Sequence, residues 1–146
     1  MPWRVNNATA IQMTEGCGGM GKWLAAAGFN GLCGVGFGAW AAHGAVSVIG
    51  PEASEWVKTG AQYQLWHAAA LLALIGLPAG WARLRAWAGS CFCLGALLFS
   101  GSLYGLALVG WRWFAYVTPF GGLAMLLGWL LLLGFGLKAW RDERIS

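Results

Sequence analysis

The residues with the greatest chemical capacity in this sequence lie in one stretch, TGAQYQLWHAAAL, which runs from Thr59 to Leu71. It begins with polar, turn-forming residues and continues into a long apolar segment. Tyr63 and His67 are four residues apart and Gln64 and His67 are three apart, so in a helix these side chains share one face. Unsatisfied polar groups are costly in hydrocarbon. We therefore predict that this face meets polar partners from the rest of the chain or from a ligand.

Other polar side chains could meet this face. Ser100 and Tyr104 lie four residues apart in a later apolar stretch, and Thr118 precedes Pro119, which cannot donate a helical hydrogen bond. If the apolar stretches are antiparallel membrane helices, these residues fall in the outer half of the membrane. His43, at the end of the first span, falls there too. The predicted polar cluster consists of His43, Tyr63, Gln64, His67, Ser100, Tyr104 and Thr118.

Our leading interpretation of this cluster is a structural hydrogen-bond network. His67 and Gln64 would bind the hydroxyl of Tyr104 or Ser100, and Thr118 would bind the carbonyl groups freed by the following proline. A few interhelical hydrogen bonds of this kind are ordinary in small membrane bundles.

Three alternatives that involve a ligand or a transported species stay open. His43 and His67 could be axial ligands of a haem, although His43 is expected to lie about one helical turn shallower. A quinone or similar amphiphile could form hydrogen bonds with His67 and Tyr104 while its ring packs on Trp66 or Trp40. An ionisable His67 could also serve a pathway for protons or small solutes, but the inner half of the spans has no matching ionisable residue.

Enzyme chemistry has the least support in the sequence. We find no metal-ligand spacing, no nucleophile motif and no intramembrane carboxylate pair, and the 4 cysteines form no C-x-x-C. We expect a non-enzymatic protein that requires no cofactor, with the haem and the quinone as the alternatives.

The elements that must position these residues are membrane helices. Of the 146 residues, 59% are hydrophobic and 10% are charged, against about 25% charged in soluble domains. Four apolar stretches, near residues 23–43, 61–80, 86–109 and 114–137, can each cross the hydrocarbon. The sequence predicts an all-α, up-and-down four-helix bundle over residues 22–140, with tails at residues 1–21 and 141–146.

The basic residues predict the orientation of this bundle. Seven lie on the side of the two tails and the second connection, and two lie on the other side. The positive-inside rule then places both termini in the cytoplasm of a bacterium, or in the matrix if the membrane belongs to an organelle. The +4 net charge follows from this topology, so no nucleic-acid partner is implied. The seven are Arg4, Lys22, Arg83, Arg85, Lys138, Arg141 and Arg144.

The connection between the first two spans is the longest, and we expect it to contain a short helix at the membrane surface. Pro51 suits a first helical turn, and Glu52 and Glu55 favour its positive end. Trp56 would hold this helix at the interface, and Gly60 would stop it or bend it into the second span. The two glutamates share a face, for which a solvated surface is favoured over a paired-carboxylate site.

Small residues mark two close-packing faces. Gly31, Gly34 and Gly38 recur at helical spacing in the first span, and Gly101 and Gly105 form a GxxxG in the third. Such faces let another helix backbone approach closely. We predict packing within the bundle; a partner subunit or a second copy is the alternative occupant.

Four motifs in order, GAWAAHG, TGAQYQLWHA, FSGSLYGLALVG and TPFGG, resemble one known family. The chain is similar to the YgdD and transmembrane-protein-256-like proteins over about residues 20–140. The resemblance implies a small four-helix membrane protein of bacteria or organelles, and it implies no reaction, because that family has no established activity. Residues 1–19 lie upstream of where the family usually begins.

The sequence offers more packing surface than chemistry. Its Gly-rich spans and Leu-rich last span favour an accessory or structural subunit that packs, within the lipid bilayer, against a larger membrane complex, with a redox complex as the expected host. The alternative is a stand-alone binder of a quinone-like molecule, or a transporter of protons or small solutes, which uses the polar cluster.

Overall fold

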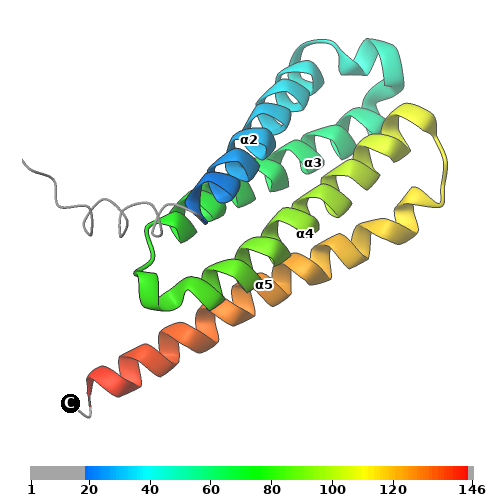
Figure 1. The fold of residues 1–146 in the computed structure, drawn as a ribbon. Coiled ribbons are helices and arrows are strands. Elements are labelled where there is room, and N and C mark those ends of the chain that lie inside the picture. Colours follow the sequence, from blue (N-terminus) through cyan, green and yellow to red (C-terminus); the bar gives the residue numbers. More distant parts are fainter. Residues whose placement is uncertain (1–18, 145–146) are drawn as a thin grey trace, which may run out of the picture.

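The computed structural model describes residues 19–144, in which all regular structure is helical (Figure 1). Parts of the two predicted tails, residues 1–18 and 145–146, lie outside this description. The predicted all-α class is confirmed. The elements are α2 (Met20–His43), α3 (Ala45–Ile75), the 3-10 turn η1 (Ala79–Trp81), α4 (Ala82–Val109) and α5 (Phe114–Glu143).

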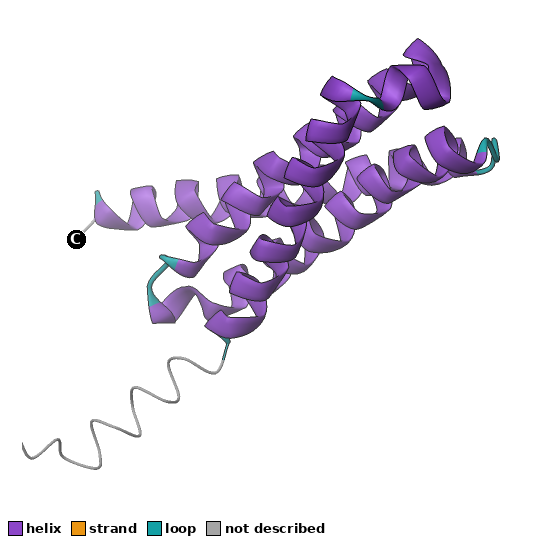
Figure 2. Cartoon of the chain, turned by 90° about the horizontal axis from the view of Figure 1, so that it is seen from above, coloured by secondary structure: helices purple, strands orange, loops and turns teal. Residues whose placement is uncertain are grey.

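The four long helices alternate in direction, and each packs mainly against its neighbours in the sequence. Short connections join them (Figure 2). Helix α3 lies between α2 and α4, whereas α5 packs along α4. We call the end of the molecule with the α2–α3 connection the Gly44 end, and the opposite end, with η1 and the end of α5, the η1 end.

The helix break that we expected at Gly60 occurs at Gly50 instead. Gly50 has φ 81° and ψ 169°, and from Pro51 the helix continues through Gly60 to Ile75. A residue before proline avoids the helical region, and glycine adopts a positive φ at little cost, so the Gly50-Pro51 pair favours the break. Residues 51–59 are therefore continuous with the second-span part of α3 and do not form a separate helix. Their position at the membrane surface stays a prediction.

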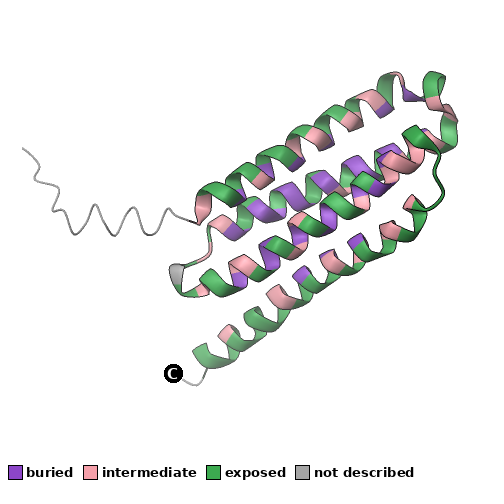
Figure 3. Ribbon diagram, turned by 45° about the vertical axis from the view of Figure 1, so that its right-hand side comes forward, coloured by how far each residue is buried: buried purple, intermediate pink, exposed green. Residues whose placement is uncertain are grey.

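Three helices, α2, α4 and α5, are long and apolar enough to cross a membrane. Helix α3 is less apolar, since the turns that follow Gly50 carry Glu52, Glu55 and Lys58, and its middle carries Gln64 and His67. It also has more buried residues than any other helix described here (Figure 3). The most polar helix is thus covered on two sides, which limits the contact of its polar groups with lipid.

The glycines of the predicted packing faces differ in their surroundings. A Cβ at Gly34 would lie 2.8 Å from the Leu65 side chain, and one at Gly105 would lie 2.8 Å from the Phe114 ring. Gly38 also faces α3, but Gly31 has nothing within 4 Å, and the same holds for Gly101. The contact with α3 therefore covers only part of the small-residue stripe on α2.

The closest helix approach joins α4 to α5. A Cβ at Gly121 would lie 2.4 Å from the backbone nitrogen of Phe99, and one at Gly95 would lie 2.9 Å from the carbonyl oxygen of Gly121. At other positions a glycine leaves room for an aromatic ring: Tyr104 lies against Gly60, and Phe92 lies against Gly128.

Replacing Gly121 by alanine should destabilise the protein by about 1–3 kcal/mol, because the new methyl group would collide with the α4 backbone and force the two helices apart. The measurement is the midpoint of unfolding in detergent. Gly101→Ala is the matched control: the methyl group enters open space, and alanine favours the helix by up to about 1 kcal/mol. Equal shifts of the midpoint for the two variants would contradict the close approach.

Candidate functional site

Gln64 joins three helices. The Tyr104 hydroxyl on α4 donates to its Oε1 at 2.8 Å, and its Nε2 donates to the Asn30 Oδ1 on α2 at 3.5 Å. The amide of Asn30 donates to the Ala26 carbonyl at 2.9 Å. Asn30 is fully buried. The predicted bond between Gln64 and Tyr104 is present, and the network extends to an asparagine that we did not single out, although an amide amid apolar residues is the signal for it.

Two hydroxyl contacts hold α4 to its neighbours. Ser100 is fully buried and donates to the Gly60 carbonyl on α3 at 2.7 Å. Ser102 and Thr118 join α4 to α5 with their hydroxyl oxygens 2.8 Å apart. Thr118 bonds the Phe114 carbonyl, which is not the carbonyl four residues before Pro119. Our expectation that Thr118 replaces the donor missing at Pro119 was therefore wrong, because its hydroxyl bonds the helical turn one residue earlier.

His67 forms a separate pair with Trp129 of α5. The indole N–H donates to His67 Nε2 at 3.3 Å, and His67 Nδ1 lies 2.8 Å from the Tyr63 carbonyl oxygen. An indole nitrogen can only donate and a carbonyl oxygen can only accept, so the proton of the neutral imidazole is on Nδ1. Trp129 was missed in the sequence, where a tryptophan in the middle of a Leu-rich span, away from either membrane surface, was the available signal.

The face that carries Tyr63, Gln64 and His67 is divided between two sides of α3. Gln64 points to α2 and α4, whereas His67 contacts α5. Three residues of helix correspond to a rotation of about 300°, which leaves the two side chains roughly 60° apart. This difference in direction is enough for Gln64 to reach α2 and α4 while His67 reaches α5.

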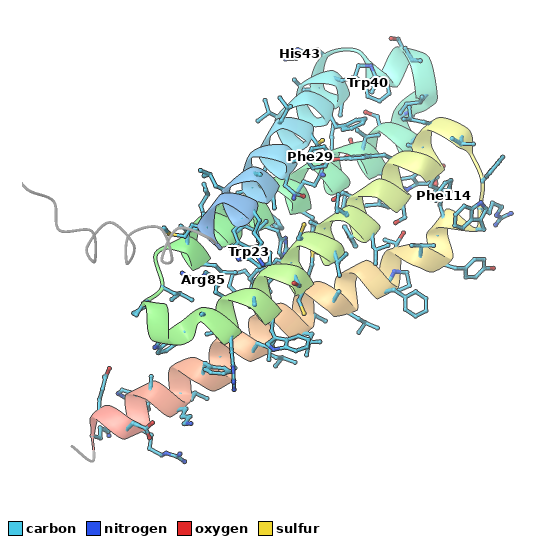
Figure 4. The ribbon with its side chains drawn as sticks, viewed as in Figure 1. Trp23, Phe29, Trp40, His43, Arg85 and Phe114 are labelled. Atoms are coloured by element: carbon cyan, nitrogen blue, oxygen red, sulfur yellow. The ribbon has the colours of Figure 1, made fainter. Side chains whose placement is uncertain are left out.

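His43 takes no part in either group. It is exposed at the end of α2 (Figure 4). The bond from the Ser54 hydroxyl to the Ala41 carbonyl places Ser54 near the level of His43, and His67 lies about 20 Å further along α3. The expected offset of one turn was wrong, and the two histidines cannot ligate one haem iron.

A groove of about 510 Å³ opens beside the pair of His67 and Trp129. Its walls are α3 and α5, and Phe99 of α4 lies between them. Trp66 is 56% exposed and Leu126 is 59% exposed, so the groove opens on the outer surface of the bundle. The lining residues are Tyr63, Trp66, His67, Phe99, Gly122, Met125, Leu126 and Trp129.

Aromatic rings make up much of this groove. The ring centroids of Tyr63 and Phe99 are 4.5 Å apart, and those of Tyr63 and Trp66 are 5.2 Å apart. Within residues 19–144 we find no hydrogen bond from the Tyr63 hydroxyl or the Trp66 indole, so both donors are available to a ligand. Nor does that region contain three His, Cys, Asp or Glu side chains placed to hold a metal ion.

A family model described as "Protein of unknown function (DUF423)" matches residues 37–122. The chain belongs to this family. The matched DUF423 region contains Gln64, His67 and Tyr104, and it ends before Trp129. The resemblance found in the sequence motifs is thereby confirmed.

Named relatives of this DUF423 protein are membrane proteins. The UPF0382 inner membrane protein YgdD of Escherichia coli (strain K12) is 40% identical over 111 residues, which cover 73% of this chain and 82% of that protein. A UPF0382 membrane protein of Haemophilus influenzae is 39% identical over 115 residues, or 76% and 90% of the two chains. One from Staphylococcus epidermidis is 37% identical over 110 residues, or 75% and 89%. No solved structure matches. The chain is a small integral membrane protein.

The bond between Tyr104 and Gln64 should be measurable as a coupling energy. Tyr104→Phe and Gln64→Leu, alone and together, form a double-mutant cycle for unfolding in detergent. We expect a coupling of about 0.6–1.7 kcal/mol, the range for interhelical hydrogen bonds in membrane proteins. Tyr116→Phe is the control, because that ring is 76% exposed, and it should leave stability unchanged. Strictly additive effects of Tyr104→Phe and Gln64→Leu would mean that the bond contributes nothing.

Proposed function

We propose that this protein is a non-enzymatic binder of a flat, hydrophobic amphiphile of the quinone type, which enters the α3–α5 groove from the lipid. The observation that carries the proposal is the groove itself: an aromatic-lined hollow of about 510 Å³ that opens toward lipid and contains unpaired donors. Pockets for small hydrophobic ligands combine an apolar lining with a few polar groups that fix orientation.

The groups in the groove have distinct roles in this proposal. A quinone presents a planar ring and carbonyl oxygens that accept hydrogen bonds. The Tyr63 hydroxyl and the Trp66 indole N–H supply donors, and the rings of Phe99 and Trp129 supply apolar walls. His67 acts indirectly: its Nε2 receives the Trp129 N–H and so orients that wall.

The Gln64 network supports the groove without lining it. In residues 19–144 no buried side-chain nitrogen or oxygen lacks a hydrogen-bond partner. The buried polar groups between α2, α3 and α4 therefore already have hydrogen-bond partners within the protein. This favours the groove over the Gln64 network as the binding site. This differs from the sequence-based hypothesis, in which Tyr104 contacts the quinone.

Filling the groove should abolish binding while the fold is retained. A Cβ at Gly122 would meet only the Phe99 ring, at 4.0 Å, so Gly122→Leu places its side chain in the hollow without a backbone collision. The measurement is quenching of tryptophan fluorescence by a short-chain quinone, with the protein in nanodiscs. For Gly122→Leu we expect quinone binding to fall below detection. Tyr63→Phe should weaken binding by roughly two- to tenfold, the value of one hydrogen bond.

The control for the filled groove is Gly136→Leu, on the same helix in open space, which should bind as the unmodified protein does. Unchanged quinone binding by Gly122→Leu, or no binding by the unmodified protein, would disprove the proposal.

A second candidate function is that of an accessory subunit in a larger membrane complex, such as a redox complex. The observation that favours it is the exposure of α5, in which only Gly121, Met125 and Gly128 are buried among the described residues. Within its own chain α5 packs almost entirely against α4, so the rest of its surface is an apolar face that another membrane protein can contact. For both functions we propose that the two termini face the cytoplasm, since the described basic residues are concentrated at the η1 end.

Purification from the native membrane in mild detergent distinguishes the two functions. An accessory subunit should elute with stoichiometric partner proteins, which mass spectrometry of the peak identifies. A stand-alone binder should elute as a small species, and the absorption spectrum of the same peak should show a retained quinone. Partners without any bound quinone would favour the second function over the first.

A further inference from the structure

A second hollow, of about 530 Å³, lies at the Gly44 end of the molecule and is separate from the groove. It is formed where the turns of α3 that follow Gly50 meet the connection between α4 and α5. Gly110 ends α4 in the left-handed conformation with φ 74°, and the chain then turns to bring Arg112 to this hollow. The lining residues are Glu52, Trp56, Leu106, Gly110, Arg112, Ala115 and Tyr116.

The hollow carries two opposite charges that do not neutralise one another. Glu52 lies in the turn of α3 that follows the break at Gly50, and Arg112 lies in the connection after α4. Within residues 19–144 neither side chain forms an ion pair, whereas the nearby Glu55 pairs with Lys58. An unpaired carboxylate and an unpaired guanidinium that line one hollow complement a ligand that carries both a positive and a negative group.

The remaining lining places this ligand at the membrane surface. Trp56 and Tyr116 are residues of the types that gather at the boundary between water and hydrocarbon. Tyr116 is 76% exposed. Leu106 and Ala115 add apolar wall, as an acyl chain or glycerol backbone requires. A charged head with an apolar tail fits this combination better than a fully soluble molecule does.

We propose that the hollow binds the zwitterionic head of a phosphatidylethanolamine-type lipid. Arg112 binds the phosphate, for which a guanidinium offers two parallel N–H donors. Glu52 accepts hydrogen bonds from the primary ammonium group. Phosphatidylcholine has no N–H to donate and phosphatidylglycerol has no cation, so Glu52 gives the site its selectivity.

The test uses the full chain in vesicles that contain equal amounts of these three lipids with identical acyl chains. The protein is released into mild detergent, and retained lipids are counted by native mass spectrometry. We expect phosphatidylethanolamine to be enriched by roughly two- to fivefold over each of the other two, a ratio in keeping with exposed charge pairs. Equal retention of all three lipids by the unmodified protein would overturn the proposal, whatever the variants do.

Three variants locate the selectivity. Glu52→Gln should bring the enrichment over phosphatidylglycerol to about one, and Arg112→Gln should lower retention of all three lipids. Glu55→Gln makes the same change of charge one turn along α3, outside the hollow, and should retain the selectivity. If Glu52→Gln keeps the full enrichment of phosphatidylethanolamine, the Glu52 carboxylate does not recognise the ammonium group and the proposal is wrong.

The same ligand chemistry could come from a soluble zwitterion. Millimolar phosphoethanolamine, which is the head group without its chains, is added to the detergent-solubilised protein. It should leave the retained lipid in place, because the apolar wall does not contribute to its binding. If phosphoethanolamine displaces the lipid at a concentration equal to that of the lipid, the assignment to a membrane lipid is overturned.

Discussion

The structure depends on the requirement that polar groups within a membrane protein find partners inside the protein. Helix α3 is the helix in which this requirement is greatest, and it lies between α2 and α4. Among the described residues, no buried side-chain nitrogen or oxygen lacks a partner. The bonds from Tyr104 to Gln64 and from Ser100 to the Gly60 carbonyl fix the height and rotation of α4 against α3. Packing by glycine makes these short approaches possible, since a Cβ at Gly60 would lie 2.7 Å from the Tyr104 ring.

Much of this arrangement could be predicted from the sequence. Hydropathy and length predicted the helices, and the common depth of the polar residues predicted that Gln64 would bind Tyr104 or Ser100, of which it binds Tyr104. The GxxxG patterns identified Gly34 and Gly105 as positions of close contact. These features depend on local composition and on periodicity along one helix, which a single sequence contains.

The parts that could not be predicted depend on how each helix is rotated about its own axis. A rotation of roughly 60° decides whether a side chain faces one neighbour or the next, and no pattern within one helix specifies it. For this reason Gln64 and His67 were expected to act together, and Trp129 was not recognised as the partner of His67. The hollow at the Gly44 end was equally inaccessible, because it combines a glutamate and an arginine that are far apart in the sequence. The helix break at Gly50 could have been predicted from the sequence, since a glycine before a proline favours such a break.

The edge position of α5 has a mechanical consequence. Its packing is almost entirely against α4, and across the groove the bond from Trp129 to His67 links it to α3. At 3.3 Å this is a long hydrogen bond, so it opposes separation of the two helices only weakly. A tilt of α5 about its contact with α4 would therefore change the width of the groove, and the bonds of Gln64 to Asn30 and Tyr104 would stay in place because they do not involve α5. Because a membrane helix can adjust its tilt to the thickness of the hydrocarbon, the surrounding lipid would act on the width of the groove through the exposed helix α5.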